Sequence, residues 1–79
     1  MKDYTWSLST RNQYGELIHS NITDTKKGYR QGWYKTEESA RKALFGWISL
    51  LRIFGHTEIK WAIYHRENNG LRMIYKGEE

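Results

Sequence analysis

The chain has 79 residues and a formal net charge of +4, from 13 Lys and Arg against 9 Asp and Glu, and it contains neither cysteine nor proline. This length suits one domain, residues 1–79, and the missing residue types exclude disulfide scaffolds, cysteine-based zinc sites, cysteine nucleophiles and polyproline segments. Only 38% of the residues are hydrophobic, but 15% are aromatic, which predicts a folded core built from a few large side chains.

The first half of the chain predicts three strands. In residues 4–9, Tyr4, Trp6 and Leu8 alternate with Thr5, Ser7 and Ser9, which is the pattern of a half-buried strand. A second strand is expected over residues 16–22 and a third over about residues 29–35, with turns at 11–15 and 23–28.

A helix is predicted to follow directly. Thr36 suits the N-cap position, and Glu37 and Glu38 in the first turn favour the positive end of the helix dipole. Gly55 is well placed to end the helix. Apolar residues recur every three or four positions and form one stripe, made of Ala40, Ala43, Leu44, Trp47, Ile48, Leu51 and Phe54.

The C-terminal residues predict a hairpin of two strands, 58–66 and 71–76. A three-residue loop at 68–70 would pair Ile63 with Tyr75 and keep apolar residues opposite each other. The same register places Arg66 opposite Arg72, an arrangement that an anion would stabilise; alternatively, both side chains extend into water. The face away from Trp61 would then carry Lys60, Ala62, Tyr64, Arg66, Arg72, Ile74 and Lys76.

These elements predict an α+β domain with the order β-β-β-α-β-β. One amphipathic helix would pack on one face of an antiparallel sheet of about five strands. The opposite face of the sheet would be left to water or to a partner.

Residues 25–35 form a basic and aromatic segment with no acidic residue. Cations without carboxylate neighbours suit phosphate binding, and exposed aromatic rings suit base stacking. The contacting residues would be Lys26, Lys27, Arg30, Tyr34 and Lys35, with Lys60, Tyr64, Arg66 and Arg72 as a second patch. The alternative is a solvated turn followed by a strand. Tyr29 and Trp33 fall on the same side of that strand, and we expect both to point into the core.

Phe45 lies outside the apolar stripe of the expected helix, beside Arg41 and Arg52. A large apolar side chain between arginines on a polar helix face is typical of a protein-interface anchor. An isolated exposed aromatic residue, or one packed under a neighbouring loop, is the alternative.

Residues 32–44 resemble the passage from third strand to helix in the three-stranded-sheet DNA-binding domains of the plant AP2 type and the integrase amino-terminal type. Those domains lay their sheet in the major groove, and the resemblance implies DNA contacts for Arg30, Tyr34 and Lys35. It covers little more than a dozen residues, and the C-terminal hairpin is absent from that pattern. The chain is therefore not assigned to either family.

Catalysis finds little support in the sequence. His19, His56 and His65 are scattered and lack metal-ligand spacing, and neither a carboxylate cluster nor a glycine-rich nucleotide loop is present. We therefore expect no enzyme activity, no metal, no cofactor and no small-molecule substrate. The N-terminus lacks a signal peptide and no stretch is long enough to span a membrane, so a cytoplasmic protein without membrane contact is expected.

The function that these features favour is a small non-enzymatic module that binds nucleic acid or a nucleoprotein complex. One alternative is an accessory inhibitor of the phage type, in the style of anti-CRISPR or anti-restriction proteins, that blocks a host protein complex. A small ribonuclease toxin is a second alternative. An exposed edge strand could also pair two copies of the chain into a homodimer.

Overall fold

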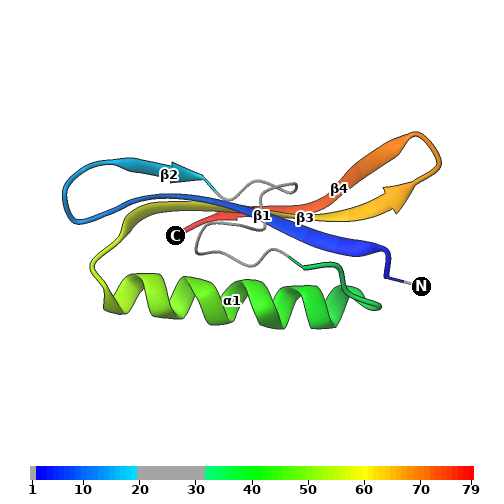
Figure 1. Cartoon of the computed structure of the whole chain (residues 1–79), viewed down its shortest axis with the longest axis horizontal. Helices are drawn as coiled ribbons and strands as arrows, with labels where there is room; N and C mark the ends of the chain where they lie inside the picture. Colours follow the sequence, from blue (N-terminus) through cyan, green and yellow to red (C-terminus); the bar gives the residue numbers. More distant parts are fainter. Residues whose placement is uncertain (1, 20–31) are drawn as a thin grey trace.

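The computed structural model describes residues 2–19 and 32–79. In these residues the protein is a small α+β domain, as predicted, with the elements β1 (Tyr4–Arg11), β2 (Leu17–His19), α1 (Glu37–Ile53), β3 (Thr57–Glu67) and β4 (Gly70–Glu78). The four strands form one antiparallel sheet in the order β2-β1-β3-β4. The helix α1 lies along one face of this sheet (Figure 1).

The helix begins and ends where the sequence predicts. The Thr36 side chain accepts a hydrogen bond of 3.1 Å from the Ser39 backbone amide, which satisfies one of the amide groups left free at a helix start. At the other end Gly55 adopts φ 82°, and the amides of Gly55 and His56 donate to the carbonyl groups of Arg52 and Leu51. This is a Schellman motif, which requires the left-handed conformation that glycine adopts without strain.

The core lies between α1 and the two central strands. Its largest member is Trp6, which is fully buried, and the alternation predicted for β1 directs Leu8 to the same side. Because α1 presents its apolar stripe up to Leu51 to this surface, the two layers bury each other. Phe54, which was predicted to belong to the stripe, is 60% exposed. The buried cluster consists of Trp6, Leu8, Ala40, Leu44, Ile48, Leu51, Ile59 and Ile63.

The prediction of a third strand before the helix lies partly outside the described residues, because these exclude 20–31. In the described part, Tyr34 forms one isolated bridge with Tyr4. The bridge places Tyr34 on the side of Tyr4, where it packs against the core. The expectation that Trp33 points inward is therefore wrong, since neighbouring residues on an extended chain face opposite sides.

The hairpin of β3 and β4 corrects the predicted register. Ile63 pairs with Tyr75 as expected, but the pairing then shifts so that Tyr64 lies opposite Met73. Ile74 is the extra residue of this β-bulge, and it packs against the core. The prediction had assumed that the alternation continues unbroken along β4.

Beyond the bulge, the turn contains only Asn68 and Asn69, and Arg66 pairs with Leu71 while Arg72 pairs with His65. The two arginines therefore do not face each other, and the argument for an anion held between them is wrong. Residues directly opposite in a sheet share a face, so Arg72 lies with His65 on the helix side.

Phe45 also departs from its prediction. Its ring packs edge-on against Trp61 of β3, with 5.2 Å between the ring centroids, and it is only partly exposed. Trp61 lies over Gly77 of β4, its cross-strand partner, and this extends the packed surface toward the sheet edge. The helix therefore buries a wider face than its apolar stripe suggests, and Phe45 belongs to that face.

Candidate functional site

The candidate site lies on the outer sheet face, which we define as the face of the sheet opposite α1. Residues of β1 and β3 that alternate with the core residues point to this face: Thr5, Ser7, Ser9, Lys60, Ala62, Tyr64 and Arg66. Lys76 of β4 pairs with Ala62 and joins them, as do Met73 opposite Tyr64 and Leu71 opposite Arg66.

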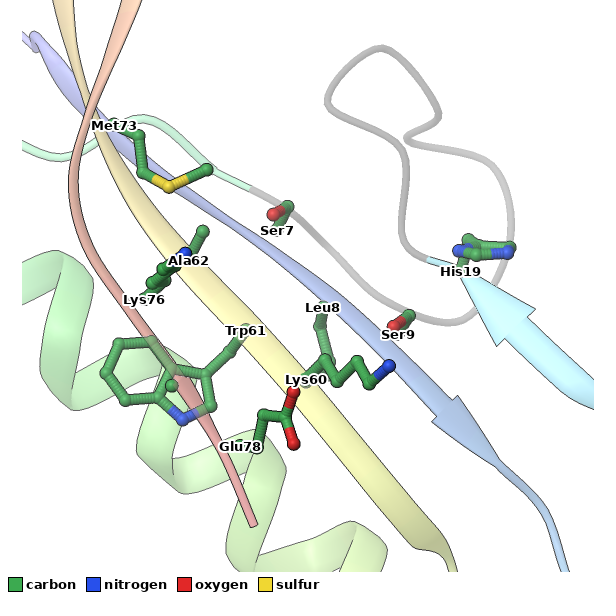
Figure 2. A pocket seen from close by; sticks show the side chains of 11 residues that line it. Ser7, Leu8, Ser9, His19, Lys60, Trp61, Ala62, Met73, Lys76 and Glu78 are labelled. Carbon is green, nitrogen blue, oxygen red and sulfur yellow. The ribbon is translucent and has the colours of Figure 1, made fainter.

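A groove of about 490 Å³ runs across this face. Figure 2 shows Ser7 and Ser9 along β1, with His19 of β2 on one side and Lys60 and Ala62 of β3 on the other. Ser7, Ser9 and Ala62 on the two central strands are small, and the longer side chains of His19, Lys60, Met73 and Lys76 surround them. Its lining residues are Ser7, Leu8, Ser9, His19, Lys60, Trp61, Ala62, Met73, Lys76, Gly77 and Glu78.

Hydroxyl groups hold the central part of the outer sheet face in place. Ser7 Oγ and the Tyr64 hydroxyl share a hydrogen bond of 3.2 Å between β1 and β3. The buried Thr5 hydroxyl donates to the Gly32 carbonyl at 2.8 Å, which fixes the chain just before the helix against β1. Ser7 and Ser9 both place a hydroxyl group along the groove, and hydroxyl groups are common hydrogen-bond partners of phosphate oxygens.

The cations of the described residues divide into two groups. Five of them have a carboxylate within 4.0 Å. One of these five, Arg11 at the end of β1, alternates with the inward Thr10 and so follows Ser7 and Ser9 on the outward side of the strand. On the helix, Arg41 and Lys42 pair with Glu37 and Glu38 one turn earlier, and Arg52 pairs with Glu79. The other two pairs are Arg11 with Glu58 and Arg72 with Glu67.

The second group has no carboxylate within salt-bridge distance in the described part of the chain; it includes Lys60, Arg66 and Lys76 of the outer sheet face, together with Lys2 and Lys35. Among the described residues, Glu78 is the acidic residue that lines the groove beside Lys60 and Lys76. Within residues 2–19 and 32–79, the face therefore carries more positive than negative charge. An anionic partner could supply the missing countercharge.

Arg66 is held in place by an aromatic ring. The centre of its guanidinium group lies 4.0 Å from the centroid of the Trp33 ring, which is a cation–π distance. Its backbone amide donates to the Asp3 carbonyl at 2.7 Å, so the main chain at this position is tied to the start of β1. Trp33 thus joins the outer sheet face beside Arg66, two residues along β3 from Tyr64, whose cross-strand partner Met73 lines the groove.

The structure brings together only part of the predicted site. Lys60, Tyr64 and Arg66 share the outer sheet face as expected, whereas Arg72 lies on the helix side, where its Nε is 2.6 Å from Glu67. Tyr34 packs inward, as described above. Lys35 is exposed beside it, while Lys26, Lys27 and Arg30 lie outside the described residues.

The helix residues proposed as a protein interface are engaged within the domain. Arg41 pairs with Glu37 and lies 4.7 Å over the ring of Tyr75. Arg52 pairs with Glu79, and Phe45 contacts Trp61. This cluster therefore contributes to the packing of α1 on β4, which the helical pattern alone could not indicate.

Lys76 completes the outer sheet face, where the sequence had placed it without naming it as a contact. The face also includes residues to which sequence reasoning had assigned no site role: Ser7, Ser9, His19, Trp33 and Met73. The alternation of β1 was the signal that could have found the serines, because it separates them from Trp6 and Leu8. Met73 could not have been placed, since the bulge at Ile74 reverses the faces of β4 beyond that point.

The histidines have separate surroundings. His19 lines the groove, His56 Nδ1 lies 3.4 Å from the Thr10 hydroxyl, and His65 stacks against Tyr4 with 4.8 Å between the rings. Within residues 2–19 and 32–79, no group of three His, Asp or Glu side chains could hold a metal ion. No helix in the same part of the chain is long and apolar enough to cross a membrane.

Comparisons with models of protein families, with curated proteins and with solved structures found no match to this chain. The function must therefore be inferred from the site itself.

Proposed function

We propose that the protein is a non-enzymatic module that binds nucleic acid across the outer sheet face. The observation that supports this most is the charge of that face: Lys60, Arg66 and Lys76 have no carboxylate partner among the described residues, whereas Arg11, Arg41, Lys42, Arg52 and Arg72 each have one. Unpaired cations bind phosphate oxygens without first breaking an internal ion pair.

The shape of the site supports a polymer better than a small ion. Lys60 and Arg66 lie six residues apart on one face of β3, which corresponds to about 20 Å along the strand. The serine hydroxyls lie near Lys60, and the Trp33 ring lies at the Arg66 end. A chain of phosphates and bases can use all of these groups at once, because it alternates anionic and planar parts.

The expected dependence of the affinity on salt concentration follows from the release of counterions by the nucleic acid. Three phosphate contacts give a slope of about −2 for the logarithm of affinity against the logarithm of salt concentration, at about −0.7 per contact on a single strand. Affinity should then fall about 15-fold between about 50 and 200 mM salt. Lys26, Lys27, Arg30 and Lys35 would steepen this slope if they also contact phosphates.

The test is a titration of a fluorescein-labelled oligonucleotide, followed by anisotropy at several salt concentrations. Replacing Lys60 and Lys76 by Ala should reduce the salt slope by about 1.4 and weaken binding at low salt. The matched control replaces Lys42 and Arg52, two cations of the helix side that have carboxylate partners. Equal effects of the two double variants, or binding that does not respond to salt, would contradict the proposal.

One observation favours the second candidate, a protein-binding inhibitor. Leu50, Ile53 and Phe54 at the end of α1 are 41%, 78% and 60% exposed, and neighbouring exposed apolar side chains are typical of protein contacts. A pull-down from lysate with and without nuclease separates the candidates. A protein partner that survives nuclease treatment, and also charge reversal at Lys26 and Lys27, supports the inhibitor and contradicts nucleic-acid binding as the main function.

A further inference from the structure

The pair formed by Arg66 and Trp33 differs from the other arginine contacts of the described residues. Arg11, Arg41, Arg52 and Arg72 each contact a carboxylate, so their hydrogen-bonding groups are at least partly occupied. Arg66 is exposed, and its guanidinium group contacts the Trp33 ring instead. A ring below a guanidinium group restricts its position and leaves its N–H groups available to a ligand.

An arginine in this setting has a specific use in nucleic-acid binding. Unstacked bases lie against aromatic rings and against the plane of arginine guanidinium groups. In a regular duplex each base is already stacked between its neighbours and paired with its partner, so such a contact requires an opened helix. The Arg66–Trp33 pair therefore suits a base that is free to leave its own stack.

The width of the sheet also argues against a duplex. At the groove, His19, Ser9, Lys60 and Glu78 lie in one row across all four strands. Strands are about 4.8 Å apart, so the outer two strands of this row are separated by about 14 Å before side chains are added. The major groove of B-form DNA is about 12 Å wide and admits a helix or a two-stranded ribbon. The full outer sheet face is too broad to enter it.

We propose that the ligand of the outer sheet face is single-stranded nucleic acid, with one base stacked on the Arg66 guanidinium group above Trp33. The phosphates continue along the groove past Lys60 and Lys76. This inference rests on the proposed function and adds the class of nucleic acid to it. It also differs from insertion of a sheet into the major groove, the mode that the local resemblance of residues 32–44 implied.

The first experiment compares three fluorescein-labelled probes of one mixed sequence of about 12 nucleotides, a length within the usual range of single-strand sites. The probes are single-stranded DNA, single-stranded RNA and the DNA annealed to its complement. We expect at least about tenfold tighter binding to a single strand than to the duplex, since stacking of one exposed base has this magnitude. Comparing the affinities of the two single-stranded probes shows whether the ligand is DNA or RNA.

The second experiment separates stacking from charge. Arg66→Lys keeps the positive charge but removes the planar guanidinium group, so it should weaken single-strand binding about five- to tenfold and leave the salt slope unchanged. Arg72→Lys is the matched control, because the same change is made on the adjoining strand to a side chain that lies on the helix side. Trp33→Leu, which removes the ring under the guanidinium group, should weaken single-strand binding in the same way as Arg66→Lys.

Each outcome has a defined meaning. Duplex binding as tight as single-strand binding, or equal effects of Arg66→Lys and Arg72→Lys, would overturn this inference while leaving nucleic-acid binding intact. Failure to bind any of the three probes would overturn the proposed function, and this inference with it. Far-UV circular dichroism on each variant verifies that the fold is retained.

Discussion

Gly77→Ala tests how β4 packs on the helix side of the sheet. Gly77 pairs with Trp61 across the hairpin, and the indole ring lies directly over it. A Cβ atom at position 77 would lie 2.6 Å from Trp61 Cε2 and 2.9 Å from Nε1, with Cζ2 closer still. Nonbonded carbon atoms prefer about 3.5–4.0 Å, so the ring would have to move by about 1 Å.

The ring has little freedom to make this movement, because Phe45 contacts it at 5.2 Å. Overpacking costs about 1–3 kcal/mol, and loss of an aromatic pair costs about 0.5–1.5 kcal/mol more. Replacing a strand glycine by alanine otherwise gains about 0.5–1 kcal/mol. We therefore expect the free energy of unfolding to fall by about 2 kcal/mol, which corresponds to a decrease of about 8–16 °C in Tm.

The assay is thermal and denaturant unfolding followed by far-UV circular dichroism. Gly46→Ala is the matched control: this glycine lies inside α1 with no atom within 4 Å of an added Cβ, so the same substitution should stabilise the protein by about 1 kcal/mol. In a Trp61→Leu background, Gly77→Ala should lower the free energy of unfolding much less than in the original protein. A neutral or stabilising Gly77→Ala in the original background would refute the packing described for Trp61.

Two further predictions concern the ends of α1, and both are checked by denaturant unfolding. Thr36→Ala removes the acceptor for the Ser39 amide and should lower the free energy of unfolding by about 1 kcal/mol. Thr36→Ser keeps a hydroxyl acceptor and should retain most of this stability. Equal free energies for the two variants would contradict the capping role. Gly55→Ala places a side chain at φ 82° and should cost about 1–2 kcal/mol. Gly15→Ala has the same φ in an exposed turn, with no atom within 4 Å of an added Cβ, and gives the cost of the conformation alone. A cost at Gly55 smaller than at Gly15 would argue against the helix-ending motif.

Local chemistry made the helix and the first strand predictable. Thr36 and Gly55 act through groups within a few residues of themselves, and the alternation around Trp6 needs only the geometry of one strand. The α+β class followed from these elements, because an apolar helix stripe and a half-buried strand must bury each other.

The features that sequence reasoning missed all depend on distant partners. The bulge at Ile74 is invisible in the alternation of β4, yet it moves Arg72 to the helix side and brings Met73 to the outer sheet face. Phe45 is partly buried because it packs against Trp61, whose ring lies over Gly77, and this contact joins three separate elements. Tyr34 turns inward because of its bridge to Tyr4, which lies thirty residues earlier in the chain.

Contacts between distant parts of the chain also determined which residues form the candidate site. Lys60, Tyr64 and Arg66 could be grouped from the sequence because they alternate along a single strand. The absence of carboxylate partners for Lys60 and Arg66 among the described residues could not be predicted, since it depends on where every other charged side chain lies. Which cations have a carboxylate partner and which do not is therefore a result of the tertiary structure.

The central claim, that nucleic acid binds the outer sheet face, is tested most directly by NMR. A ¹⁵N-labelled sample is titrated with the unlabelled single-stranded oligonucleotide, and the shifts of the backbone amide signals are followed residue by residue. The account predicts that the largest shifts occur at Ser7, Lys60, Arg66 and Lys76, while those of Lys42 and Ser49 on the outward side of α1 hardly change. Shifts confined to the helix, or spread evenly over both faces, would contradict it.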